Sequence, residues 1–291
     1  MYGRKYCAGN MSYTKNVITL HPDSSIHDAL LLMNNNDIKR IVIISDGNPV
    51  GIVTERDIGK FLQNDKTSRM LNQIHLDEIM SRNLFTISKD QDEILVQCAI
   101  RMDAFQISSI VVVDEEKLEG IVTKSDLVNN FSKLFTGLYK VKDYMNTNII
   151  TCRKSDSLLF ALNMLNRNKI SRLVVTDNDG KPVGIISYDT FLRNSPYFRS
   201  GAENTREYLL PKTSARGLFV NDVVGNELLT IGYNDDLAKA AKLMSEYKIS
   251  GIPVVNENGD LEGVVTATDI VRAYHEVKIH AVIQRNDPHF A

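Results

Sequence analysis

Hydrophobic and polar residues follow one pattern along this chain, and the pattern occurs four times. Each copy opens with a short apolar stretch. Apolar residues then recur three or four positions apart, as they do on one face of a helix. Two apolar stretches separated by a turn come next, and a second helical segment closes the copy. Self-similarity of this kind predicts four repeats of one small structural unit.

The first copy shows the predicted elements clearly. Residues 16–19 predict a short strand, which a helix with one apolar face follows. Residues 41–44 predict a fully buried strand, and a turn at 46–49 connects it to a returning strand at 50–53. The second helix is expected to begin directly after Thr54, because threonine is a favoured N-cap residue.

The other copies repeat this order of elements. Their first strands are predicted at 83–86, 148–151 and 228–230. In every copy an isoleucine stands five residues after the last apolar residue of the first helix. These isoleucines are Ile38, Ile107, Ile170 and Ile249.

The most similar stretch of the four copies is a glycine, two apolar residues, a hydroxyl residue and an aspartate three positions later. It occupies 51–57, 120–126 and 263–269, and in a weaker form 184–190. The hydroxyl and carboxylate are spaced as in a capping box, in which both side chains bond free N–H groups of a helix. The same N-terminus could bind a phosphate with its N–H groups and its dipole. The residues alone favour the capping interpretation.

A unit of this kind has one three-stranded sheet with helices on one face. At about 60 residues it is too small to be stable alone, so we expect the copies to pair into two domains of the α/β (α+β) class. The repeats are predicted at 13–64, 76–135, 140–193 and 219–278, with an N-terminal arm at 1–12, an insertion at 194–218 and a C-terminal tail at 279–291.

The pattern resembles the CBS (cystathionine β-synthase) domain from about residue 13 to residue 277. The chain is similar to proteins with four CBS domains in two tandem pairs, called Bateman modules, of which the regulatory subunit of AMP-activated protein kinase is a familiar example. This resemblance implies two clefts per module, which in many members bind adenosine nucleotides. With this resemblance, ligand binding becomes the favoured interpretation of the signature threonines and aspartates, in place of capping alone.

The resemblance implies that each cleft takes a threonine and an aspartate from one repeat and an apolar wall for adenine from its partner. The threonines are Thr54, Thr123 and Thr266. Asp57 is expected opposite Phe85 and Ile107, Asp126 opposite Ile18 and Ile38, and Asp269 opposite Ile150 and Ile170. The aspartates would accept hydrogen bonds from the ribose hydroxyls.

Four cations are further candidates. Arg40 and Arg172 match the family position that often reaches a phosphate, although a solvated surface charge is an equally good interpretation of either. Arg56 and Lys124, on the first turn of a helix, are weaker candidates.

The third repeat departs from the signature. Thr190 occupies the position of the aspartate, three residues after Ser187. We therefore expect the fourth cleft, opposite Leu228 and Ile249, to be empty or altered.

Composition limits the remaining functions. The net charge of −2 gives no global attraction to nucleic acid, and no apolar run approaches a membrane span. No signal-peptide pattern opens the chain, and its three cysteines have no metal-binding spacing, which favours a cytoplasmic location. The histidines are scattered, no nucleophile motif is present, and Cys98 is expected as a small core residue. We expect neither catalysis nor a required cofactor.

These observations predict a cytoplasmic regulatory protein that binds AMP, ADP or ATP and signals their occupancy to a partner, and that forms a homodimer. The alternative is an interaction or scaffold protein with partly vestigial clefts. Such a protein could use the basic insertion at 194–218 to bind a protein or ribonucleoprotein partner.

Overall fold

The structure is a computed structural model that describes residues 13–193 and 218–286, apart from 66, 68 and 226. The predicted arm at 1–12 and all but the last residue of the predicted insertion lie outside these residues. The predicted tail differs from the structure at its start, because residues 279–286 continue the last helix, α11.

The described residues form four three-stranded sheets, one in each repeat. In each sheet the first strand is parallel to the central one and the third is antiparallel to it. The strands are β1 (Thr19–Leu20), β2 (Arg40–Ser45) and β3 (Asn48–Thr54); β4 (Thr86–Ser88), β5 (Ser109–Asp114) and β6 (Lys117–Thr123); β7 (Thr151–Arg153), β8 (Arg172–Thr176) and β9 (Pro182–Ser187); β10 (Ile231–Gly232), β11 (Gly251–Val255) and β12 (Leu261–Thr266). The predicted fold class is confirmed.

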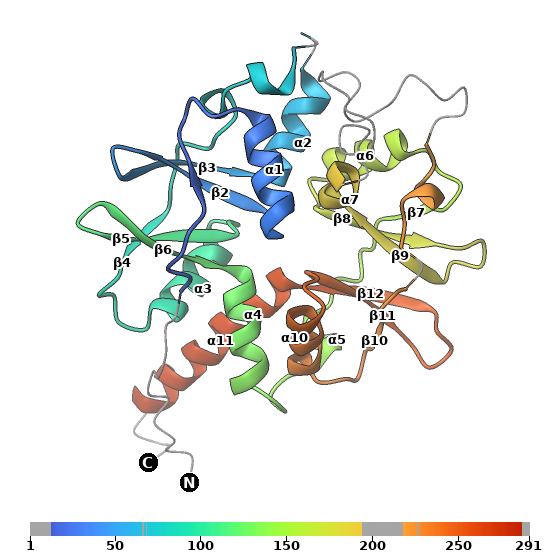
Figure 1. Ribbon diagram of the computed structural model, residues 1–291. Coiled ribbons are helices and arrows are strands. Elements are labelled where there is room, and N and C mark those ends of the chain that lie inside the picture. The colour runs from blue at the N-terminus through green and yellow to red at the C-terminus, as the bar shows by residue number, and fades with distance from the viewer. Residues whose placement is uncertain (1–12, 66, 68, 194–217, 226, 287–291) are drawn as a thin grey trace.

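Two main helices accompany each sheet, and short helical turns connect the repeats (Figure 1). The main helices are α1 (Ile26–Asn36), α2 (Glu55–Asn64), α3 (Ile94–Ala104), α4 (Lys124–Leu134), α6 (Leu158–Arg167), α7 (Tyr188–Arg193), α10 (Leu237–Glu246) and α11 (Ala267–Asn286). The connecting turns are η1 (Leu71–Gln73), η2 (Leu76–Glu78), α5 (Val141–Tyr144) and η3 (Val220–Asp222).

The first strand of every repeat begins later than the sequence predicts. It starts at Thr19, Thr86, Thr151 and Ile231 rather than at 16, 83, 148 and 228. The residues just before the strands are apolar for another reason: Val17 and Leu84 pack between the sheets of repeats 1 and 2. The apolar pattern of the sequence alone does not distinguish these extended residues from residues of a hydrogen-bonded strand.

The first hairpin is also tighter than predicted. Its turn consists of Asp46 and Gly47, both with positive φ (53° and 82°), as a two-residue hairpin turn requires. Asn48 and Pro49 already belong to β3, and Pro49 lies where the register shifts, which is one of the places where a strand tolerates proline.

The isoleucine five residues after each apolar helix face closes a Schellman motif. Its backbone N–H donates to the carbonyl five residues earlier, at 3.0–3.2 Å in all four repeats. The residue before it adopts a left-handed conformation, with φ between 52° and 55° at Asp37, Gln106, Lys169 and Lys248. The fixed spacing found in the sequence is therefore a helix-ending motif whose isoleucine also packs on the core.

Paired repeats are interlocked by the segment at the start of each repeat, which comes before its first strand. Thr14 bridges to Ile121 of repeat 2, Ser81 to Ile52 of repeat 1, and Asn146 to Val264 of repeat 4. Each segment passes directly over the signature glycine of its partner. A Cβ on Gly51 would lie 2.5 Å from Met80 Sδ, and one on Gly120 would lie 2.7 Å from the Thr14 carbonyl oxygen. The signature therefore requires glycine because another chain segment crosses there.

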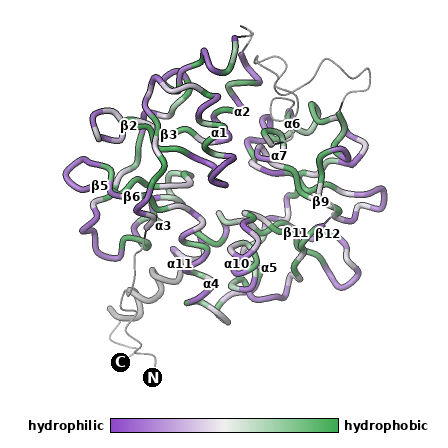
Figure 2. The backbone as a smooth tube through the Cα atoms, viewed as in Figure 1, coloured by the Kyte–Doolittle hydropathy of each residue, from purple (hydrophilic) through white to green (hydrophobic). Residues whose placement is uncertain are grey.

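The two modules meet through their helices. Helix α2 packs against α7, and α4 and α11 pack against each other and against α10 and α3. One hydrophobic core joins repeats 2 and 4, in which Phe135 contacts Tyr274 edge-on at 5.3 Å between ring centroids. Figure 2 shows polar residues at the hairpin turns on the rim and hydrophobic residues along the inner strands and helices.

Candidate functional site

The three threonine–aspartate pairs of the signature form capping boxes. In each, the threonine N–H and Oγ1 both donate to Oδ2 of the aspartate, at 3.0 and 2.5 Å for Thr54 and Asp57. The same two bonds are 2.7 and 2.7 Å at Thr123 and Asp126, and 2.9 and 2.7 Å at Thr266 and Asp269. The aspartate of every pair therefore caps its threonine, and at the first pair the Asp57 N–H also donates to Thr54 Oγ1 at 3.3 Å.

Capping uses one of the two carboxylate oxygens. No residue in the described part of the chain donates a hydrogen bond to Oδ1 of Asp57 or of Asp126. An ionised carboxylate has about four acceptor positions, so a capped aspartate can still accept bonds from a ligand. Asp269 differs, because its Oδ1 accepts a bond from Arg272 Nη2 at 3.1 Å.

A cavity of about 180 Å³ lies between repeats 1 and 2. Thr54 and Asp57 line it from the N-terminus of α2, and Phe85 and Ile107 line it from repeat 2. The structure thus brings together the four residues that the sequence places in one cleft. The sequence reasoning missed Ile52, Ser81, Asn83, Leu84, Gln106, Ser108, Ser109 and Val111. Most of them flank a predicted residue, so proximity in sequence was the available signal.

An aromatic pair adjoins this cavity. The rings of Phe85 and Phe105 lie 4.7 Å apart, and Phe105 is 57% exposed. The cavity therefore combines an aromatic wall, several serine and amide groups, and a carboxylate at a helix N-terminus. This set of groups can hold a flat ring against apolar side chains while a carboxylate accepts bonds from hydroxyl groups.

Arg40 and Arg172 each reach across to the partner repeat. Arg40 Nη1 donates to the Ser108 carbonyl, and Arg172 Nη2 donates to Ser250 Oγ. Burial lowers the pKa of Arg40, and it lowers the pKa of Arg172 to about 10. Both arginines are half-buried and bonded to the partner repeat, so neither is a fully solvated surface charge. The negative charge of Asp126 opposes the lowering of the Arg40 pKa, and the charge of Asp269 opposes the lowering of the Arg172 pKa.

Two further cations cross between the modules. Lys124 Nζ donates to Thr268 Oγ1 at 2.8 Å, and Arg56 Nη2 donates to the Lys169 carbonyl at 2.9 Å. Arg56 Nε is buried without a hydrogen-bond partner among the described residues. Burial, followed by the charges of Arg172 and Arg40, lowers the pKa of Lys124 to about 8.

Replacing Lys124 by methionine should change how stability depends on pH. Because the folded-state pKa of Lys124 is near 8 and its ordinary value is 10.5, the unfolded chain binds more protons between these pH values. The unfolding free energy of the wild type should therefore rise relative to Lys124→Met as pH increases through this window. Urea unfolding from pH 7 to 10.5 measures the difference.

Lys117, which is exposed on a hairpin, supplies the matched control. The curve for Lys117→Met should run parallel to that of the wild type. A Lys124→Met curve that is also parallel would contradict the lowered pKa.

The third repeat caps its signature helix without a carboxylate. The Ser187 N–H donates to Thr190 Oγ1 at 3.1 Å, so the threonine hydroxyl takes the position of the aspartate oxygen. Tyr188, the first residue of α7, is buried and packs against Gly59 of α2. This helix N-terminus thus serves contact between the modules.

The remaining candidate walls are half-buried. Ile38 packs on the core of repeat 1, and Ile150 and Ile170 pack on the core of repeat 3. Ile18 is half-buried just before β1. Each of the three packed isoleucines therefore contributes to a core.

The two cysteines among the described residues are core residues. Cys98 and Cys152 are buried, and burial raises the pKa of each to about 12, which disfavours the nucleophilic thiolate. No group of three or more potential metal ligands occurs among the residues described.

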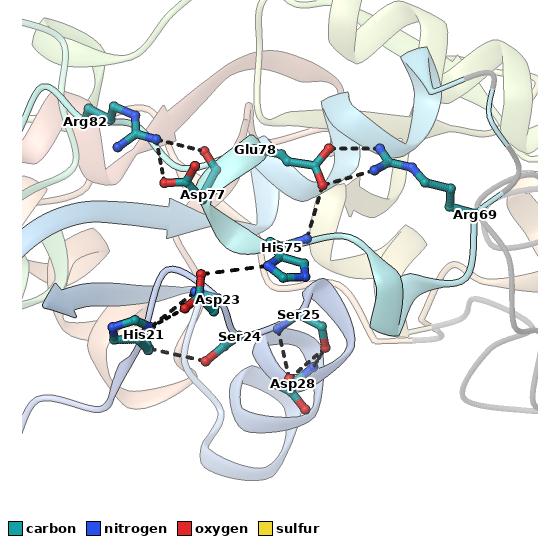
Figure 3. A network of polar contacts seen from close by, with 10 residues as sticks. All are labelled: His21, Asp23, Ser24, Ser25, Asp28, Arg69, His75, Asp77, Glu78 and Arg82. Atoms are coloured by element: carbon teal, nitrogen blue, oxygen red, sulfur yellow. Dashed lines mark hydrogen bonds and ion pairs between the residues drawn. The ribbon is translucent and has the colours of Figure 1, made fainter.

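The polar network around His75 is structural. Figure 3 shows His21 and His75 facing Asp23, with the capping box of Ser25 and Asp28 alongside. In the same network Arg69 pairs with Glu78 at 3.0 Å, and Arg82 pairs with Asp77. Both of these pairs lie within the segment that carries η1 and η2. The segment is joined to repeat 1 by backbone bonds, from the Leu76 N–H to the Ser24 carbonyl at 2.8 Å and from the Ile26 N–H to the Ile74 carbonyl at 3.0 Å.

A sequence model of the CBS domain matches residues 9–64, 76–133, 141–197 and 220–276. The chain belongs to the CBS-domain family. Its four CBS domains form two Bateman modules, as the resemblance in the sequence implied. Among the described residues, none of the helices has the length and apolar character needed to cross a membrane.

Two proteins of Methanocaldococcus jannaschii are similar over most of the chain. MJ1404 is 28% identical over 277 residues, which cover 93% of this chain and 62% of MJ1404, so the chain spans less than two thirds of that relative. MJ1225 is 25% identical over 285 residues, which cover 91% of this chain and 97% of MJ1225. A CBS domain-containing protein of Dictyostelium discoideum is 35% identical over 134 residues, covering 45% of this chain and 88% of that protein.

The crystal structure of MJ1225 has the same fold. It superposes with a TM-score of 0.77 at 24% sequence identity, and the match covers 90% of this chain and 98% of MJ1225. That protein is described as a proposed archaeal homologue of γ-AMPK.

Proposed function

We propose that this four-CBS chain binds adenine nucleotides between paired repeats and passes their occupancy to a partner protein by contact, without catalysing a reaction. The observation that carries the proposal is the cavity in which Thr54 and Asp57 face Phe85 and Ile107. It places an aromatic wall opposite a carboxylate with an available oxygen. These are the two features that an adenine ring and a ribose diol require.

In this proposal the adenine packs against Phe85 and Ile107, and Asp57 Oδ1 accepts bonds from the ribose hydroxyls. The N-terminus of α2 and nearby cations favour the phosphate. The description of MJ1225 as a relative of γ-AMPK agrees with an adenine nucleotide as the ligand.

The proposal extends to two more clefts. Thr123 and Asp126 would use Ile18 and Ile38 with Arg40. Thr266 and Asp269 have the equivalent neighbours Ile150, Ile170 and Arg172, but Asp269 Oδ1 already accepts a bond from Arg272. The position of Arg40 near Asp126, and of Arg172 near Asp269, supports these assignments. Thr190 provides no carboxylate, so the fourth cleft has no equivalent ribose acceptor.

We expect calorimetric titration with AMP, ADP, ATP and S-adenosylmethionine to give saturable binding of at most three nucleotides per chain. Two of them should lie within residues 13–135, where both signature aspartates have an available oxygen. A nucleotide with ordinary ribose contacts at Ser187 and Thr190 would contradict this count. Absence of binding by every nucleotide would favour the alternative of an interaction protein with vestigial clefts.

The homodimer stays a prediction. The helices α2, α4, α7, α10 and α11 already join the two modules of one chain. A dimer would therefore need a different surface. Analytical ultracentrifugation with and without nucleotide measures this directly.

A further inference from the structure

The Asp269 cleft differs from the Asp57 cleft in what contacts the second carboxylate oxygen. Arg272, one turn after Asp269 on α11, donates Nη2 to Asp269 Oδ1 at 3.1 Å. Oδ2 already accepts the N–H and Oγ1 of Thr266. Of about four acceptor positions on a carboxylate, three are therefore filled at Asp269, and one remains. A ribose that donates both of its hydroxyls needs two.

Tyr144 holds Arg272 in this position. The same Nη2 donates to the Tyr144 carbonyl at 2.8 Å, and the guanidinium lies over the Tyr144 ring at 5.6 Å from its centroid. Tyr144 is itself fixed, because it is buried, packs edge-on against Tyr139 and donates its hydroxyl to Glu276 of α11. Arg272 is therefore clamped between a carboxylate, a carbonyl and an aromatic face.

Repeat 1 has neither member of this clamp. Lys60 follows Asp57 by three residues, as Arg272 follows Asp269, but Lys60 is exposed and forms no ion pair with Asp57 within the described chain. Ile79 stands where Tyr144 does. Each directly precedes the methionine that covers a signature glycine, Met80 over Gly51 and Met145 over Gly263. Both changes meet at one carboxylate, so they distinguish the Asp269 cleft from the Asp57 cleft. In repeat 2, Asn129 stands three residues after Asp126, so that cleft also has no cation at the position of Arg272.

We propose that Arg272 and Tyr144 form a latch that excludes a ribose diol from Asp269, so this cleft stays empty at nucleotide concentrations that fill the clefts of Asp57 and Asp126. The inference rests on the proposed function and assigns Arg272 as a specificity-determining residue within it. Arg172 remains beside Asp269 when Arg272 is removed, so the carboxylate keeps a cationic neighbour.

The test is calorimetric titration of the full chain with AMP, ADP and ATP, comparing the wild type with Arg272→Met. Methionine keeps part of the apolar stem but cannot donate to Asp269. The wild type should bind two nucleotides, and Arg272→Met should gain a third site at least tenfold tighter than any residual binding there. Asp269→Ala in the Arg272→Met background should abolish the gained site. Lys60→Met is the matched control and should leave two sites.

The outcomes separate the two proposals. Three sites of similar affinity in the wild type would overturn the latch, and so would two unchanged sites in Arg272→Met with no third. In both cases nucleotide binding itself would stand. No binding by the wild type or any variant would overturn the proposed function together with the latch. Urea unfolding of Arg272→Met, compared with the wild type, checks that the second module of the variant is folded.

Discussion

Replacing Asp57 by alanine should weaken nucleotide binding at its cleft by about 1.5–3 kcal/mol, because it removes a charged acceptor of ribose hydrogen bonds. The same substitution removes half of a capping box, which should cost about 1 kcal/mol of stability. Asp126→Ala should behave in the same way at the second cleft. Calorimetry with the nucleotide that binds the wild type, combined with urea unfolding, measures both effects.

The chain contains a control with the same local geometry. Ser25 and Asp28 form a capping box at the N-terminus of α1, where the Ser25 N–H and Oγ donate to Asp28 Oδ2 at 2.9 and 2.7 Å. Asp28→Ala should therefore lose similar stability without losing nucleotide affinity. If Asp57→Ala lowers stability but leaves affinity unchanged, the carboxylate is a cap and nothing more.

Replacing Gly120 by alanine should destabilise the first module by about 1–3 kcal/mol, the usual cost of overpacking. The new Cβ would lie 2.4 Å from the Tyr13 ring and 2.7 Å from the Thr14 carbonyl oxygen. Thr14 is fixed by two backbone hydrogen bonds with Ile121, each 3.0 Å long, so the crossing segment cannot move away without breaking them. Thermal and urea unfolding measure the loss.

Alanine substitutions at two other glycines provide a comparison for the stability loss expected at Gly120. Gly51→Ala should cost less, because the atoms in its way belong to the flexible side chain of Met80. Gly225→Ala should be neutral or slightly stabilising, because a Cβ there meets no atom within 4 Å and the unfolded chain loses freedom. Equal losses at Gly120 and Gly225 would show that the crossing contact does not set the cost.

The sequence predicted the repeat architecture because repetition makes the same signal visible four times. Ile38 and its three equivalents illustrate this, since a single isoleucine says little, while a fixed spacing in every repeat marks one helix-ending motif. The pairing of Asp57 with Phe85 and Ile107 in one cavity came from the resemblance, and the structure places these residues together.

Other features depend on contacts between distant residues that periodicity does not encode. The first strands begin later than the apolar pattern predicts because Val17 and Leu84 are partly buried between sheets rather than paired within one. Arg172 is bonded to Ser250 of another repeat, a contact that its local sequence does not indicate. The contact of Arg272 with Tyr144 joins residues 128 positions apart and had no signal in either local sequence.

The crossing segments also determine the smallest part of this chain that can fold independently or be duplicated as a unit in evolution. The third strand of repeat 1 is bridged by the first residues of repeat 2, and the third strand of repeat 2 is bridged by the first residues of repeat 1. During synthesis, the bridge from Ile52 to Ser81 therefore cannot form until Ser81 has left the ribosome. Thr14, in contrast, has been synthesised before the second repeat emerges and can bridge to it at once. A duplication or exchange of a single repeat would leave one strand uncovered. The unit that duplicates in this architecture is therefore the pair of repeats.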